Sequence, residues 1–93
     1  MEPTVRNVEQ RSRYELILDD QIVGIADYRV DGDTVIFPHT EVLAHLRGRG
    51  LGESLVRGAL DDVRASGRSV VARCWFVEQF LDDNPEYADL RAA

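Results

Sequence analysis

Lysine is absent from this chain of 93 residues, and cysteine, methionine and tryptophan each occur only once. The single Cys74 cannot form an internal disulfide, so the chain is not a disulfide-stabilised secreted module, and a reducing compartment, the cytoplasm, is expected. No apolar run approaches the ~20 residues of a membrane-spanning helix, and the first ten residues lack the basic and apolar segments of a secretory signal. One cysteine and two histidines at unrelated spacings match no metal-binding pattern, so no metal is expected.

Arginine supplies all the positive charge, and it is unevenly distributed. Eleven arginines against 17 acidic residues give a net charge of −6 at pH 7, which argues against general binding to nucleic acid or anionic membranes. Residues 47–73 nevertheless hold six arginines and only three acidic residues, whereas both flanking segments are acidic. This basic segment predicts a binding place for a small anion, and local compositional variation is the alternative explanation.

Alternation of apolar and polar residues predicts a sheet in the first half of the chain. Period-two patterns, separated by Asp-Asp and Asp-Gly-Asp turns, predict strands at 13–18, 21–30 and 34–42. Residues 1–12 have the weaker pattern of a lead-in strand. In the second predicted strand, one face is expected to hold Ile22, Ala26, Tyr28 and Val30. Pro38 has no amide hydrogen for a ladder, so the third strand is expected to be bulged or splayed there.

The hydrophobic period changes to that of a helix after residue 50. The apolar stripe consists of Leu51, Leu55, Val56, Ala59, Leu60 and Val63. Gly67 is a typical helix stop, whereas Gly58 lies inside the helix at a cost of about 1 kcal/mol relative to alanine. Either a neighbouring element approaches closely at Gly58 or the cost is tolerated. A strand at 69–73, a short helix at 75–81 and final helical turns from Pro85 complete the order. We therefore predict an α+β (mixed α/β) fold in one domain, residues 1–93.

Glycine is concentrated where the third strand leads into the long helix. Gly48, Gly50 and Gly52 are three of the seven glycines, and Arg47 and Arg49 stand beside them. Glycine lets backbone amides face a ligand without a Cβ in the way, and the first amides of a helix are unpaired at the positive end of its dipole. The combination predicts a pyrophosphate-binding loop. A P-loop is disfavoured because it needs a lysine, and a dinucleotide fingerprint because its glycine spacing differs.

The segment Arg47 to Gly52 reads Arg-x-x-Gly-x-Gly and resembles the pyrophosphate loop of the GNAT superfamily of acetyl-CoA-dependent N-acetyltransferases. Further segments are similar, in order, to the small YjdJ-type branch of that superfamily: 14–16, 26–29, 39–42, 46–52, 55–56, 74–77 and 84–87. The resemblance covers nearly the whole chain. It implies a GNAT-like fold in which antiparallel strands precede a β-α-β unit with a splayed central strand, followed by C-terminal helices.

The resemblance also implies where the co-substrate acetyl-CoA binds. Coenzyme A would lie in the notch between the third and fourth main strands, with its pantetheine amides paired to the backbone of Glu41, Val42 and Leu43. The pyrophosphate would be held by the loop residues Arg47, Gly48, Arg49, Gly50, Leu51 and Gly52, with the two guanidinium groups supplying charge. Larger members carry helices between the first two strands. Here a two-residue turn replaces them, so the acceptor side is expected to be open or completed by a second subunit in a homodimer.

Three residues are candidates for catalysis, each with a structural alternative. Glu41 is a candidate general base, acting directly or through water, or is simply an exposed strand residue. His39 is a second candidate base, or a strand-end histidine bonded to the backbone. Cys74 follows the strand expected beside the thioester, and the resemblance implies that it is a candidate catalytic residue. A nucleophilic cysteine would allow an acetyl-enzyme intermediate, and direct transfer to the amine is the other route. The nucleophilic role needs a thiol pKa lowered by His39 or by a helix N-terminus; the alternative is a small buried hydrophobe.

Tyr87 is a further candidate, as the proton donor to the departing thiolate, or else an aromatic residue that packs the final helix. The predicted function is acetyl-CoA-dependent transfer of an acetyl group to the amine of a small molecule or peptide. Two other functions remain open at this point. One is a non-catalytic binder or sensor of coenzyme A or acyl-CoA, and the other is a protein-interaction module in which the glycine-rich loop is only a turn.

Overall fold

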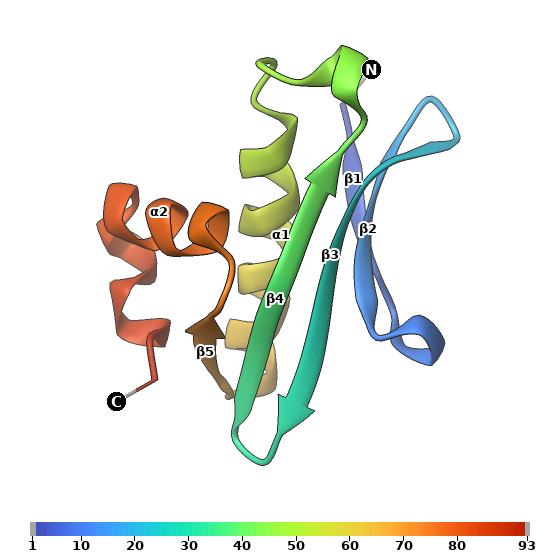
Figure 1. Cartoon of the computed structure of the whole chain (residues 1–93). Coiled ribbons are helices and arrows are strands. Elements are labelled where there is room, and N and C mark those ends of the chain that lie inside the picture. The colour runs from blue at the N-terminus through green and yellow to red at the C-terminus, as the bar shows by residue number, and fades with distance from the viewer. Residues whose placement is uncertain (1, 93) are drawn as a thin grey trace.

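Five strands form one sheet in the computed structural model, which describes residues 2–92 (Figure 1). They are β1 (Thr4–Val8), β2 (Arg13–Leu18), β3 (Gln21–Asp31), β4 (Thr34–Val42) and β5 (Ser69–Ala72). The strands lie side by side in sequence order, the first four antiparallel and β5 parallel to β4. The predicted strands are confirmed to within one residue at each end, the lead-in strand is β1, and the mixed α/β class is confirmed.

Two α-helices and three short 3-10 helices complete the chain. They are η1 (Glu9–Arg11), η2 (Ala44–Leu46), α1 (Leu51–Ser66), α2 (Trp75–Asp83) and η3 (Pro85–Leu90). The predicted apolar stripe of α1 is buried over its whole length. In Figure 1, α1 lies behind β4, and no helix is drawn in front of β3 or β4. None of the helices in residues 2–92 is both long and apolar enough to cross a membrane.

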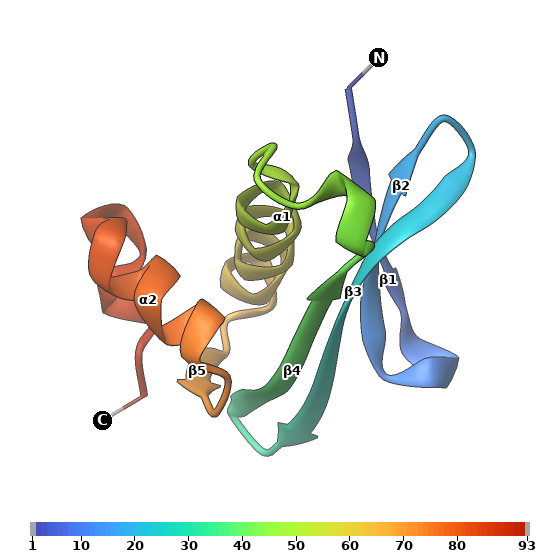
Figure 2. The ribbon, with the colours of Figure 1, turned by 45° about the horizontal axis from the view of Figure 1, so that its top comes forward.

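The core lies between the sheet and α1, and α2 and η3 extend it beyond β5 (Figure 2). The rings of Tyr14 and Phe37 stack at 6.1 Å between centroids on the sheet side. Tyr87 of η3 is buried and donates a hydrogen bond of 2.6 Å from its hydroxyl to Asp61 of α1. The C-terminal turns are therefore attached to α1 and not only to the sheet.

A bulge between β2 and β3 changes which side chains of β3 reach the core. Leu16 pairs with Gly24 and Ile17 pairs with Ile22, so Val23 is an extra residue in the ladder. Val23 is buried, whereas Ile22 is 43% exposed, which corrects the predicted apolar face. An extra residue reverses the alternation of side chains beyond it, and a period-two pattern cannot show this in advance. Ala26 is in the core as predicted, and Val30, near the turn to β4, is 46% exposed.

The predicted irregularity at Pro38 is present and marks the point where β4 leaves β5. On the β3 side, Asp27 pairs with His39 and the next pair begins at Ile36, so Phe37 and Pro38 form the bulge. On the other side, β5 pairs with β4 only as far as Phe37, and the Arg73 amide donates the last bond to the Phe37 carbonyl at 3.0 Å. The remainder of β4, to Val42, continues beyond the reach of β5.

The close approach that we considered at Gly58 is present. A Cβ on this residue would lie 2.6 Å from Cγ2 of Val5 in β1. Helix propensity alone favours alanine by about 1 kcal/mol, but the clash outweighs it. We predict that Gly58→Ala lowers the free energy of unfolding by about 1–3 kcal/mol in urea denaturation. In a Val5→Ala background, which removes both methyl groups but leaves a Cβ at 2.7 Å, the loss should be smaller, and a stabilised single variant would contradict the close packing of β1 on α1.

Candidate functional site

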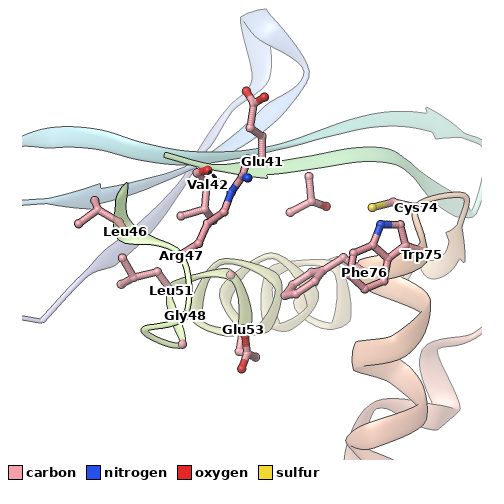
Figure 3. A pocket seen from close by; sticks show the side chains of 13 residues that line it. Glu41, Val42, Leu46, Arg47, Gly48, Leu51, Glu53, Cys74, Trp75 and Phe76 are labelled. Atoms are coloured by element: carbon pink, nitrogen blue, oxygen red, sulfur yellow. Dashed lines mark hydrogen bonds between the residues drawn. The ribbon is translucent and has the colours of Figure 1, made fainter. Parts of the chain in front are cut away.

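A cavity of about 580 Å³ lies between the free part of β4, the loop before α1 and the start of α2 (Figure 3). The separation of β4 and β5 opens it. Of the residues predicted to bind coenzyme A, those that line the cavity are Glu41, Val42, Arg47, Gly48, Gly50, Leu51 and Gly52. Cys74 lines it from the opposite end. Leu43, Arg49 and His39 are not among the lining residues, so the structure does not bring these three candidates to the cavity.

The edge of β4 that borders the cavity is unpaired. The Leu43 amide donates to Val23 of β3 at 2.9 Å, so its hydrogen-bonding groups belong to the other edge of the strand. Alternation then turns the backbone groups of Val42 toward the cavity, where its carbonyl accepts a 3.2 Å bond from Nε of Arg47. An unpaired strand edge is a template for an extended ligand that carries amides. The predicted contact at Leu43 is not supported, because that amide is already used in the sheet.

The loop at the other side of the cavity presents a run of backbone amides. Gly48 and Gly50 have φ values of 84° and 76°, which residues with a Cβ rarely adopt. Within the described part of the chain, the amides of Gly48, Arg49 and Gly50 donate to no backbone carbonyl. The first bond of α1 runs from the Ser54 amide to the Gly50 carbonyl, so the amides at 51–53 are also unpaired within the helix. This arrangement suits an anion at the helix N-terminus.

Cys74 stands at the N-cap position of α2 with its thiol partly buried. Burial alone would raise the pKa of the thiol, but the Thr40 hydroxyl and the backbone amides of Val77 and Phe76 outweigh it, and the pKa is lowered. The Cys74 side chain forms no capping hydrogen bond of standard geometry. Of the two predicted causes of a lowered thiol pKa, the helix N-terminus is the one present, and His39 is not a contributor.

The other catalytic candidates lie away from the thiol. Glu41 is among the lining residues, but its carboxylate points away from the cavity (Figure 3). Alternation from Leu43 turns the backbone hydrogen-bonding groups of Glu41 toward β3, so the predicted backbone contact at Glu41 is not supported either. His39 is exposed and, two residues earlier on the strand, shares the face of Glu41. Tyr87 lies outside the cavity, buried against α1 through its bond to Asp61. Packing, the alternative that we gave for Tyr87, is therefore what the structure shows.

Five residues that line the cavity were not anticipated as site residues, namely Thr40, Leu46, Glu53, Trp75 and Phe76. Thr40 lines it on the same strand as Glu41, and no motif in the sequence distinguishes this threonine from other strand residues. Trp75 also lines it and is 78% exposed, with its ring nearly perpendicular to that of Phe76. Phe76 packs partly against the core, and its ring also borders the first turn of α1: a Cβ on Gly52 would lie 2.8 Å from its Cζ. The only feature of the sequence that could have indicated this contact is the glycine at position 52, which leaves room for an aromatic ring.

Residues 13–90 match the family model of the GCN5-related N-acetyl-transferases. The chain belongs to this family. Among curated relatives, Protein NATD1 of Xenopus tropicalis is 33% identical over 66 residues, which are 71% of this chain and 60% of that protein. The chain thus spans about three fifths of the length of that relative. The family resemblance inferred from the Arg-x-x-Gly-x-Gly loop is confirmed, and assignment to the YjdJ-type branch stays a prediction.

Solved structures of other proteins have the same fold. A GCN5-like putative N-acetyltransferase from Staphylococcus aureus aligns with a TM-score of 0.73 at 22% identity, covering 97% of this chain and 88% of that one. N-acetylglutamate synthase from Neisseria gonorrhoeae, complexed with coenzyme A and N-acetyl-glutamate, aligns with a TM-score of 0.63 at 23% identity, covering 77% of this chain and 19% of that one. At these identities the likeness establishes the GNAT fold.

The contact between Gly52 and Phe76 gives a test of the cavity. Gly52→Ala adds a methyl group that must push the Phe76 ring toward the cavity, so we predict coenzyme A binding weakened roughly fivefold or more. The measurement is isothermal titration calorimetry. The double variant Gly52→Ala/Phe76→Leu should regain most of the affinity because the ring that is displaced is gone. Unchanged affinity in Gly52→Ala would mean that Phe76 does not border bound coenzyme A.

Proposed function

We propose that this chain is an acetyl-CoA-dependent N-acetyltransferase that acts on an amine. One observation carries the proposal: a single cavity joins unpaired loop amides, an unpaired strand edge and a thiol of lowered pKa. These features are complementary to the pyrophosphate, the pantetheine amides and the thioester of acetyl-CoA, in the order in which that molecule carries them. Membership of the GCN5-related family supports the same assignment.

Fewer residues are proposed to bind coenzyme A than the sequence predicted. The pyrophosphate accepts hydrogen bonds from the amides between Gly48 and Gly52, at the positive end of α1. Arg47 supplies the guanidinium, since it lines the cavity and is already oriented by the Val42 carbonyl. Arg49, outside the cavity, adds only long-range positive charge. The pantetheine arm lies along β4 beside Val42, which directs the thioester toward Cys74.

Acetyl transfer then proceeds through Cys74. The ionised Sγ attacks the thioester carbonyl, a new bond forms between Sγ and the acetyl carbon, and the bond to the coenzyme A sulfur breaks. Coenzyme A leaves as a thiolate and takes a proton from solvent. A neutral amine attacks the acetyl-cysteine, the C–N bond forms, and Cys74 leaves as a thiolate. The amine nitrogen gives up its extra proton to a base.

Glu41 is the base that we propose for that proton. A free alkyl amine has a pKa of roughly 10.4 and must lose a proton before it attacks. The Glu41 carboxylate points out of the cavity in Figure 3, and Glu41 is exposed, on the face of β4 turned away from α1. We propose that the acceptor approaches from this exposed face and transfers its proton to Glu41 through water. His39, on the same face, is the second candidate.

A second function, binding of acyl-CoA without turnover, is favoured by one observation. Both carboxylates that belong to cavity-lining residues, those of Glu41 and Glu53, point out of the cavity in Figure 3. A binder would use the same loop and strand edge but no acceptor. Tight binding of coenzyme A without turnover on any amine in a broad screen would favour this function over catalysis.

Binding can be followed through the only tryptophan of the chain, Trp75, because it lines the cavity. We predict that coenzyme A changes the Trp75 fluorescence and raises the melting temperature. Arg47→Gln should weaken binding by roughly tenfold. Arg49→Gln is the matched control, because it removes the same charge two residues away, outside the cavity, and should change affinity far less. If millimolar coenzyme A alters neither signal, the proposed function is wrong.

Because the chain has no lysine side chain that could be acetylated, mass spectrometry can detect acetylation of Cys74 without that interference. After incubation with acetyl-CoA and no acceptor, we predict a single hydroxylamine-labile acetyl group in the intact mass, absent from Cys74→Ser. Turnover by Cys74→Ser should fall by at least a hundredfold, since a serine hydroxyl is scarcely ionised at neutral pH. Wild-type turnover in Cys74→Ser would exclude the acetyl-cysteine and leave direct attack by the amine.

A further inference from the structure

Thr40 and Cys74 face one cavity from two chain segments that are no longer paired. Thr40 lies on β4 beyond the last residue paired with β5, and Cys74 follows the end of β5. Val42 packs against the core, and Thr40, two residues earlier on the strand, shares that face. Both Thr40 and Cys74 line the cavity. The separation of the strands therefore leaves a hydroxyl and a thiol on its two walls.

The hydroxyl of Thr40 has no ordinary partner. Its Oγ1 is buried and makes no hydrogen bond of standard geometry among residues 2–92. Buried side-chain oxygens usually have a partner, and threonine commonly finds one in the nearby backbone. Thr34, on the same strand, does so by donating to the Asp31 carbonyl at 2.8 Å. The contrast indicates that the Thr40 hydroxyl is available to a group inside the cavity.

We infer that the Thr40 hydroxyl donates a hydrogen bond to the ionised Sγ of Cys74 and is the positioning residue that favours the ionised form of this sulfur. The inference deepens the proposed function and rests on it for the role of Cys74 as acetyl carrier. Ionisation of the thiol is a property of the free protein, and it can be measured whether or not the chain has acetyltransferase activity.

The shift of the Cys74 pKa agrees with this geometry. Burial raises the pKa, and the Thr40 hydroxyl is the largest of the influences that lower it, ahead of the amides of Val77 and Phe76. A hydrogen bond to the charged form stabilises that form, whereas burial opposes it. Both effects act on the Cys74 sulfur, so removal of the Thr40 hydroxyl should raise the pKa of the thiol.

The charged groups around the cavity do not account for the same effect. The carboxylates of Glu41 on β4 and Glu53 on α1 point out of the cavity (Figure 3). Arg47 is bonded to the Val42 carbonyl at the loop end of the cavity. Arg73 and Glu78, before Cys74 and in the first turn of α2, are exposed and of opposite charge. No charged residue is among the main influences on the thiol, which leaves the Thr40 hydroxyl, the amides of α2 and the backbone amide of Thr40 itself.

The test uses the free protein and its only cysteine. The rate of alkylation by iodoacetamide is measured against pH, and its midpoint gives the pKa of Cys74. Thr40→Val removes the hydroxyl at nearly constant shape, and we expect the midpoint to rise and the rate at neutral pH to fall roughly three- to tenfold. Thr40→Ser should restore the wild-type profile. Thr34→Val is the control for losing a threonine hydroxyl from the same strand, and it should leave the profile unchanged.

Each outcome decides the inference. Circular dichroism and thermal unfolding establish that the variants are folded, and Thr40→Ala replaces Thr40→Val if the latter is not. A raised midpoint that serine restores supports the inference even if no acetyl transfer is found. An unchanged midpoint overturns it. If acetylation of Cys74 is lost while the midpoint stays unchanged, the hydroxyl acts on the thioester oxygen and not on the sulfur, which also overturns it.

Discussion

The separation of β4 from β5 is the constraint on which the site depends, and it follows from Phe37 and Pro38. An extra residue in the β3–β4 ladder and a proline without an amide hydrogen end regular pairing at one point. Beyond it, β4 stays bonded to β3 on one edge and is bare on the other. The bare edge, the loop amides and the start of α2 then enclose one cavity. Continuous pairing along β4 would fill that space with backbone.

Close contacts at two glycines fix α1 relative to this opening. Gly58 lets β1 approach the middle of the helix, and Gly52 admits the Phe76 ring near its N-terminus. The first contact holds the helix against the far strand of the sheet. The second connects the amide-bearing loop to α2, the helix that carries Cys74 at its cap. A chain of this size can bury little surface. Close packing at Gly58 and Gly52 therefore helps to hold α1 in place, a task that a larger hydrophobic core performs in larger proteins.

Most of the backbone, and the loop, could be predicted from the sequence because their signals are local. Period-two strands, the apolar stripe of α1 and the glycine spacing each depend on neighbouring residues. The positions that were predicted wrongly, Ile22 and Leu43, depend on how β3 pairs with its neighbouring strands. One extra residue at Val23 moved Ile22 to solvent, and the pairing of Leu43 with Val23 took its amide away from the cavity. Thr40 could not be predicted as a site residue from the sequence. The role proposed for it depends on Cys74, which is distant in the sequence and lines the same cavity only in the folded protein.

The same register explains why the catalytic candidates divide between two sides of β4. Thr40 and Val42 face α1 and the cavity, whereas His39 and Glu41 alternate to the side that no described helix covers. In the proposed function, acetyl-CoA chemistry and amine deprotonation would thus occupy opposite faces of one strand. An acetyl-cysteine suits that division, because it lets the acyl group remain on the protein after coenzyme A departs. The amine then needs to reach only the sulfur at the open end of the strands, and not the coenzyme in its cavity.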